Sequence, residues 1–255
     1  MLSGSLLDFP VSLALVLQQA TSDASWVHAP TGPDLARAFL RWAHFVAGIA
    51  WIGLLYFFNL VNVPLMKKLD GPTKKAVIPE LMPRALWYFR WGAVVTVLVG
   101  LTYYAMYILS TDARNAGANT WEWLGLWLLV VLVLYAALYG ALQSVNNGNL
   151  LAVIIAVIAL VFTGIVLYLF RDPTVSNKTL SIGVGGGLGI WMLLNVWGII
   201  WRAQKQIIAA TVAGTTPPAD LARKAFLASR TNAWLSLPML FFMSASHGDF
   251  IIFGK

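Results

Sequence analysis

The chain has 255 residues, of which 59% are hydrophobic and 11% charged, with a formal net charge of +7 and a mean hydropathy of +0.75. Soluble domains average a little under half apolar and about a quarter charged, so one water-soluble core could not hide this much apolar surface. The composition therefore excludes a soluble enzyme, a nucleic-acid-binding protein and a disordered tail as interpretations of the whole chain. It predicts an all-α membrane protein in a lipid bilayer, with the excess of Lys and Arg in cytoplasmic loops.

The first 34 residues are predicted to form a separate N-terminal segment. Residues 5–17 are apolar but short, contain Asp8 and Pro10, and have no basic region before them. We therefore expect residues 1–34 to lie at the non-cytoplasmic membrane surface, and a signal peptide is the less favoured alternative. Residues 35–255 are predicted to be one six-span membrane domain.

Six stretches are apolar enough to cross a bilayer, which takes about 20 residues. They cover roughly residues 36–62, 84–110, 121–143, 149–170, 179–202 and 231–253. The two long connections, after the first and the fifth span, carry most of the Lys and Arg residues. The positive-inside rule places both connections in the cytoplasm, so that both termini are expected on the non-cytoplasmic side.

The sequence contains no Cys, which excludes disulfides, iron–sulfur clusters and covalently attached c-type haem. Any haem or transition-metal site then depends mainly on the three His residues. His44 lies inside the first span, about 12 Å below its outer end at 1.5 Å per residue. An ionisable side chain at that depth is costly, which favours a functional role over a simple hydrogen bond to a neighbouring helix. His28 is expected at the surface of the polar N-terminal segment.

His247 ends the sixth span and is expected near the outer surface, in the same leaflet as His44. Haem b held between two helices needs an imidazole on each face of the iron at similar depth. We therefore predict haem b as the cofactor, with His44 and His247 as iron ligands. Arg41, one turn before His44, is expected to pair with a haem propionate or an anionic substrate. The alternatives are that His247 only caps its helix and that Arg41 reaches the lipid headgroups.

Small and polar residues inside the later spans predict close helix packing. The glycine run 183–189 lacks the Lys-Ser/Thr of a phosphate loop and lies in an apolar span, so it indicates close approach of helices or of a cofactor. Asn195 and Asn232 are amides suited to hydrogen bonds between helices. No span carries an acidic residue at its centre, which argues against a proton-coupled transporter.

Three stretches resemble the N-terminal membrane domain of the membrane-integral urate oxidases, also called urate hydroxylases. They are Arg41–Gly53 (RWAHFVAGIAWIG), Leu86–Trp91 (LWYFRW) and Asn232–Met243 (NAWLSLPMLFFM), the last followed by His247. The resemblance implies a membrane oxidoreductase that oxidises urate toward 5-hydroxyisourate and passes electrons to a cytochrome c. Family members commonly carry that cytochrome as a C-terminal domain, whereas this sequence ends at Lys255 without Cys, so a separate cytochrome c is the expected acceptor. The candidate substrate-binding residues are Asn232 and Trp42.

Two positions depart from the family pattern. Gly92 stands where an acidic residue is expected, and Thr231 lies near a position expected to hold a His. At both positions an expected ionisable side chain is absent, whereas His44 and His247 are present. Three functions stay open: a haem-containing redox protein, a non-catalytic accessory subunit packed with other membrane subunits of an electron-transfer complex, and a small-molecule transporter. The expected location is a bacterial inner membrane.

Overall fold

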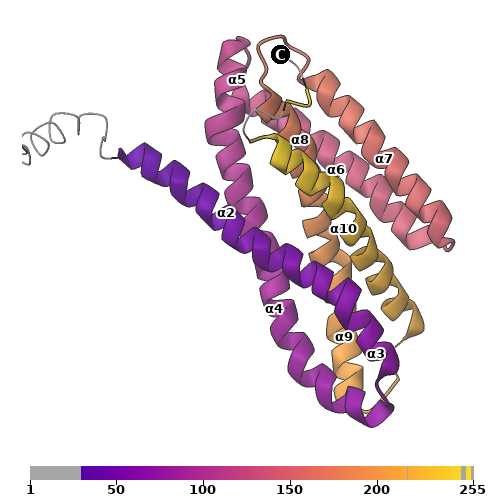
Figure 1. The fold of residues 1–255 in the computed structure, drawn as a ribbon. Helices are drawn as coiled ribbons and strands as arrows, with labels where there is room; N and C mark the ends of the chain where they lie inside the picture. Colours follow the sequence, from indigo (N-terminus) through magenta and orange to yellow (C-terminus); the bar gives the residue numbers. More distant parts are fainter. Residues whose placement is uncertain (1–29, 217, 248–250, 254–255) are drawn as a thin grey trace, which may run out of the picture. The chain divides into compact units, whose positions relative to one another are not determined.

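The computed structural model describes residues 30–216, 218–247 and 251–253, and these residues are helical without any strand (Figure 1). Most of the predicted N-terminal segment, including His28, lies outside the described residues. The chain divides into two units, residues 1–38 and 39–255, and every site discussed below lies within the second unit.

Six helical rods follow one another along the described residues. The first consists of α2 (Gly32–Tyr56), η2 (Phe57–Asn62) and α3 (Val63–Lys68), and the second of α4 (Gly71–Tyr103), η3 (Tyr104–Leu109) and α5 (Ser110–Asn115). The third and fourth are α6 (Thr120–Ser144) and α7 (Gly148–Leu169). The fifth consists of α8 (Asn177–Asn195), η4 (Val196–Ile200) and α9 (Trp201–Val212), and the sixth is α10 (Ala219–Ala245). The η segments are short π-helical stretches inside otherwise α-helical rods.

Five of these rods are long and apolar enough to cross a membrane. They are Gly32–Lys68, Gly71–Asn115, Thr120–Ser144, Gly148–Leu169 and Asn177–Val212. The sixth, α10, was also expected to span but is less apolar, because Arg230, Thr231 and Asn232 lie in its middle. The predicted all-helical membrane bundle is confirmed, and the side on which the termini lie stays a prediction.

Polar side chains cap the beginnings of the second, third, fourth and fifth rods. The side chains of Asp70, Asn119, Asn147 and Ser176 each accept a hydrogen bond from a backbone N–H in the first turn that follows. Such bonds satisfy N–H groups that have no partner within the helix. At Asp70, the bonds from Thr73 hold the pKa of the carboxyl below its ordinary value of 3.8. These caps explain why an almost continuously apolar sequence breaks into separate rods.

Three rods are longer than a bilayer is thick. At 1.5 Å per residue the 45-residue rod Gly71–Asn115 is about 68 Å long, against about 40–45 Å for a bilayer with its headgroup regions. Part of the extra length lies at the bottom of Figure 1, where the start of α4 packs against α9 and where α3 ends. This region, which we call the basic end, carries cationic residues of both long connections. They are Lys67, Lys68, Lys74, Lys75, Arg84, Arg202 and Lys205. The expected cytoplasmic loops are therefore mostly helix.

Helix α8 lies at the centre and packs against α4, α6, α7 and α10. Its glycines allow this close approach. A Cβ at Gly185 would lie 3.1 Å from the carbonyl oxygen of Met239, and one at Gly187 would overlap the ring of Phe162. The glycine run thus serves close helix packing, one of the two uses that its composition indicates.

Candidate functional site

A cavity of about 460 Å³ brings together residues of the first and the last helical rod. Its walls come from α2, α4, η3, α6, α8 and α10, together with the two residues that follow α10. Most of the lining is apolar. The lining side chains with a hydroxyl, imidazole or guanidinium group are Arg41, His44, Thr96, Tyr103, Tyr104, Ser246 and His247.

His44 forms a hydrogen bond to α4, and a glycine of α4 leaves room for its ring. Its Nδ1 lies 2.8 Å from the carbonyl oxygen of Thr96. A carbonyl only accepts, so Nδ1 carries the proton and Nε2 keeps a free lone pair. A Cβ at Gly100 would lie 2.6 Å from Nδ1 and 2.8 Å from Cε1 of His44, so only glycine leaves room for the ring. Thr96 and Gly100, one turn apart on α4, therefore set both the tautomer and the position of this imidazole.

His247 has a similar arrangement just beyond the end of α10. Its Nδ1 lies 2.9 Å from the carbonyl oxygen of Met243 and 3.0 Å from the hydroxyl of Ser246. Donation to the Met243 carbonyl again leaves Nε2 with its lone pair. The ring of Phe45 lies near both imidazoles, at centroid distances of 6.1 Å from His247 and 6.3 Å from His44.

Both histidines have the hydrogen-bond arrangement that an imidazole ligand of a haem would need. A histidine that binds a metal commonly donates its other ring N–H to a backbone carbonyl or carboxylate, and both His44 and His247 donate to a carbonyl. The cavity also has open space beside α8, because a Cβ at Gly186 would meet no atom closer than 3.8 Å and one at Gly189 none within 4 Å. Within the described part of the chain no cluster of three or more His, Cys, Asp or Glu occurs, and His44 and His247 are the residues of this cavity that could hold a haem.

The three other predicted site residues lie in different surroundings. Arg41 lines the cavity and is exposed, so its guanidinium can pair with an anionic group there. Trp42 is 61% exposed and does not line the cavity. Asn232 is fully buried away from it, donating to the carbonyl of Met192 at 2.9 Å and accepting from Asn195 at 2.8 Å. The structure therefore brings neither expected substrate-binding residue to the cavity, and Asn232 joins α10 to α8.

Several lining residues were not found by sequence reasoning. Thr96 and Gly100 lie in an apolar span, and a Thr and a Gly four residues apart in such a span do not by themselves indicate a site. Tyr104 and Trp127 line the cavity with their rings, while their O–H and N–H groups donate to the carbonyls of Thr179 and Gly183. These two rings therefore form an apolar wall, with their polar atoms already paired within the protein.

The two positions that depart from the family pattern lie apart from one another. Gly92 lies where α2 crosses α4, and a Cβ there would be 3.3 Å from the carbonyl oxygen of Ala47 and 3.4 Å from Cβ of Trp51. Thr231 is buried in α10 and does not line the cavity. Position 92 is thus a close helix crossing in this chain, where a Cβ would make a tight contact with α2.

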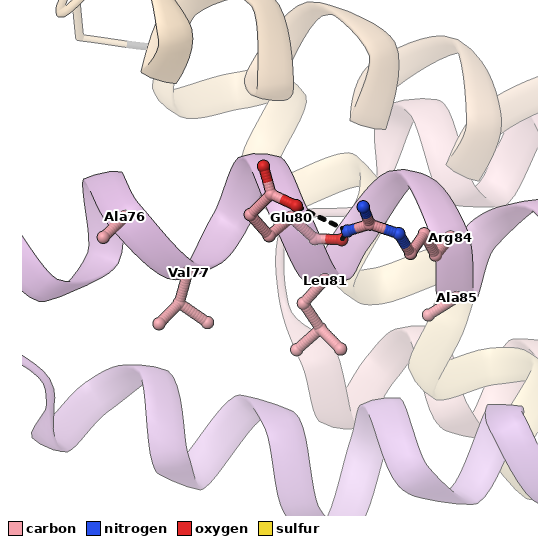
Figure 2. A pocket seen from close by; sticks show the side chains of 6 residues that line it. All are labelled: Ala76, Val77, Glu80, Leu81, Arg84 and Ala85. Atoms are coloured by element: carbon pink, nitrogen blue, oxygen red, sulfur yellow. Dashed lines mark hydrogen bonds and ion pairs between the residues drawn. The ribbon is translucent and has the colours of Figure 1, made fainter.

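A shallow pocket on the outer face of α4 does not form a comparable site. Figure 2 shows its six lining residues, all from one stretch of α4 at the basic end. Glu80 and Arg84 form an ion pair of 2.6 Å across it, and both side chains are more than two-thirds exposed. An exposed pair of this i,i+4 type contributes little to stability, and we assign it no function.

Most of the chain matches a known protein family. Residues 70–254 match the family described as urate oxidase N-terminal. The matched range includes His247 and two of the three resembling stretches, whereas Arg41 and His44 precede it. No curated protein and no solved structure is matched. Because the matched range covers well over half of the sequence, the chain belongs to the urate oxidase N-terminal family.

Proposed function

We propose that this chain is an oxidoreductase of a bacterial inner membrane in which His44 and His247 hold a haem b. Its proposed substrate is urate, and its proposed electron acceptor is a separate cytochrome c. Membership of the urate oxidase N-terminal family supports urate. The observation that carries the haem proposal is the pair of imidazoles on the walls of one apolar cavity, each with Nδ1 on a carbonyl and Nε2 free.

The protein's contribution in this proposal is to orient two ligands and to exclude water. A haem bound in the cavity would supply one-electron redox chemistry. The carbonyls of Thr96 and Met243 fix the imidazole tautomers and, as hydrogen-bond acceptors, make both rings better electron donors. The apolar walls keep the site at low dielectric, which favours the less charged state of any redox group inside it.

Arg41 is the proposed contact for the substrate. Urate is a planar anion at neutral pH, and the flat guanidinium group offers several N–H donors to such a ligand. Oxidation of urate to 5-hydroxyisourate takes its oxygen from water and releases two electrons and two protons, so a one-electron cytochrome c must accept electrons twice. Arg41→Gln is expected to raise KM for urate while leaving the absorption spectrum of the protein unchanged.

An optical experiment separates the haem proposal from the urate proposal. The full chain is expressed with ample haem, purified in mild detergent, and recorded as a reduced-minus-oxidised spectrum. We expect Soret and α bands that disappear in His44→Ala, change to those of a high-spin haem in His247→Ala, and persist unchanged in the matched control His28→Ala. A colourless wild-type preparation overturns the haem proposal. Haem bands without urate-dependent reduction of added cytochrome c leave the haem site standing and overturn urate as the substrate.

A further inference from the structure

A groove of about 730 Å³ lies between α6 and the rod formed by α8, η4 and α9. It shares no lining residue with the histidine cavity. Tyr135 and Tyr139 line it from α6, and Trp201, Arg202 and Lys205 line it from α9. We call it the α6–α9 groove.

The groove is polar at one end and apolar at the other. Arg202 and Lys205 are exposed and lie one turn apart where the fifth rod enters the basic end. Leu194 lines the groove eight residues earlier, about 12 Å deeper along the helix axis. Between them, a Cβ at Gly198 would meet only the hydroxyl of Tyr135, at 3.8 Å, so the floor is smooth. The groove therefore suits an amphipathic ligand with an anionic head and an apolar tail.

Among the described residues, no carboxylate forms an ion pair with a cation that lines the groove. The ion pairs among the described residues are Glu80–Arg84 and Asp220–Lys224. Neither pair includes a residue that lines the groove. A third cation lies next to a residue that lines the groove, because the guanidinium of Arg90 stacks 3.9 Å from the ring centroid of Trp201. Lys205 Nζ lies 5.5 Å from the same ring, so cations from two helices gather around one indole.

The surroundings of the groove match the boundary between lipid and water. Tyr139 lies five residues before the end of α6, where the chain turns into the 145–147 connection. Tyr and Trp side chains prefer this boundary, and basic pockets between membrane helices on the cationic side bind the headgroups of acidic lipids. A free phosphate ion would contact Arg202 and Lys205 but would leave the apolar part of the groove unfilled.

We propose that the α6–α9 groove binds an anionic phospholipid such as phosphatidylglycerol. The phosphate pairs with Arg202 and Lys205, and one acyl chain lies along Gly198 and Leu194. This site is separate from the proposed haem site, so an experiment can overturn one proposal without affecting the other.

The test measures lipid binding to the full chain in non-ionic detergent by native mass spectrometry. Phosphatidylglycerol and phosphatidylcholine with identical acyl chains are titrated in parallel, and inorganic phosphate is added in a third series. We expect wild-type protein to bind phosphatidylglycerol more tightly than phosphatidylcholine. The double variant R202Q/K205Q should weaken phosphatidylglycerol binding about 30-fold, as two cations near a membrane surface imply, and leave phosphatidylcholine unchanged. The matched control K67Q/K68Q removes two charges from α3, also at the basic end, and should change binding less than about threefold.

A third variant, Gly198→Leu, tests the apolar floor without altering any charge. It fills the path of the acyl chain and should weaken phosphatidylglycerol binding. Circular dichroism and gel filtration verify that each variant is folded. The proposal is overturned if the two lipids bind wild-type protein equally, if K67Q/K68Q loses as much affinity as R202Q/K205Q, or if Gly198→Leu binds like wild type. It is also overturned if inorganic phosphate displaces the lipid at equal concentration, since the site would then be one for a free anion.

Discussion

Alanine at Gly100 is expected to displace the His44 imidazole and to destabilise the protein. The new Cβ would lie 2.6 Å from Nδ1 of His44, whereas unstrained contacts between such atoms are about 3.5 Å long. The ring must therefore retreat by roughly 0.9 Å. That movement breaks the 2.8 Å hydrogen bond to the carbonyl of Thr96, which is what orients Nε2.

The size of the effect follows from three contributions. Replacing Gly by Ala inside a helix stabilises it by about 0.5–1 kcal/mol. Overpacking a close contact costs about 1–3 kcal/mol, and leaving the Nδ1–H of His44 without its acceptor costs about 1–3 kcal/mol. We therefore expect Gly100→Ala to lower the free energy of unfolding by about 1–5 kcal/mol and to weaken haem binding as well.

Denaturation of the purified protein by SDS measures this change, with haem titration in parallel. The matched control is Gly48→Ala, which lines the same cavity but whose Cβ would be 3.6 Å from Cγ2 of Thr96, an ordinary contact. The control should be as stable as wild type or slightly more stable. Adding His44→Ala to Gly100→Ala should remove most of the overpacking cost, since the clashing ring is gone. Equal stability of Gly100→Ala and Gly48→Ala would refute the described position of the His44 ring.

Three further predictions concern the scaffold, and unfolding measurements test each of them. Gly187→Ala should destabilise the protein by about 1–3 kcal/mol, because its Cβ would overlap the buried ring of Phe162. Asn232→Leu should cost about 1 kcal/mol, the usual scale for a hydrogen bond between membrane helices. Because the bonds from Thr73 lower the pKa of Asp70, this cap stabilises the native state fully above pH 3.8 and loses its effect as the pH falls through the lowered value. Asp70→Ala should remove that part of the acid dependence.

Each of these predictions has its own control. Gly189→Ala adds a Cβ with no atom within 4 Å, and a loss as large as that of Gly187→Ala would refute the overlap. Asn195→Leu should cost as much as Asn232→Leu, and additive losses in the double variant would show that the two amides do not interact. Asp70→Asn keeps a cap acceptor that does not titrate, so an unchanged acid dependence in this variant would contradict the assignment to Asp70.

The helical architecture could be predicted from the sequence because apolar runs of membrane length have few alternatives to helix. The lengths of the rods could not be predicted from the apolar stretches. The second span was expected from residue 84, whereas α4 begins at Gly71, because the cap at Asp70 starts a helix that continues through water into the bilayer. Helix α10 also begins well before the apolar stretch expected from residue 231, at Ala219, although no side chain caps its first turn. The apolar stretches therefore predict the membrane-spanning parts of these helices but not where the helices begin.

The site illustrates what helical geometry alone can and cannot predict. Arg41 lies three residues before His44 and shares its face, whereas Trp42, two residues before, points about 200° away and stays outside the cavity. Asn232 precedes His247 by 15 residues, about 22 Å along the helix axis, so spacing already argues against a shared site. In contrast, the bond from His44 to Thr96 joins residues 52 apart in the chain, and no local pattern indicates which α4 residues face α2.

The central claim is that two imidazoles from α2 and from the end of α10 are available to one ligand in the shared cavity. Electron paramagnetic resonance of the oxidised, haem-loaded protein tests it most directly. The account predicts a six-coordinate, low-spin signal with two imidazole ligands that becomes high-spin in His247→Ala. A wild-type protein that binds no haem, or a high-spin signal that His247→Ala leaves unchanged, would contradict it.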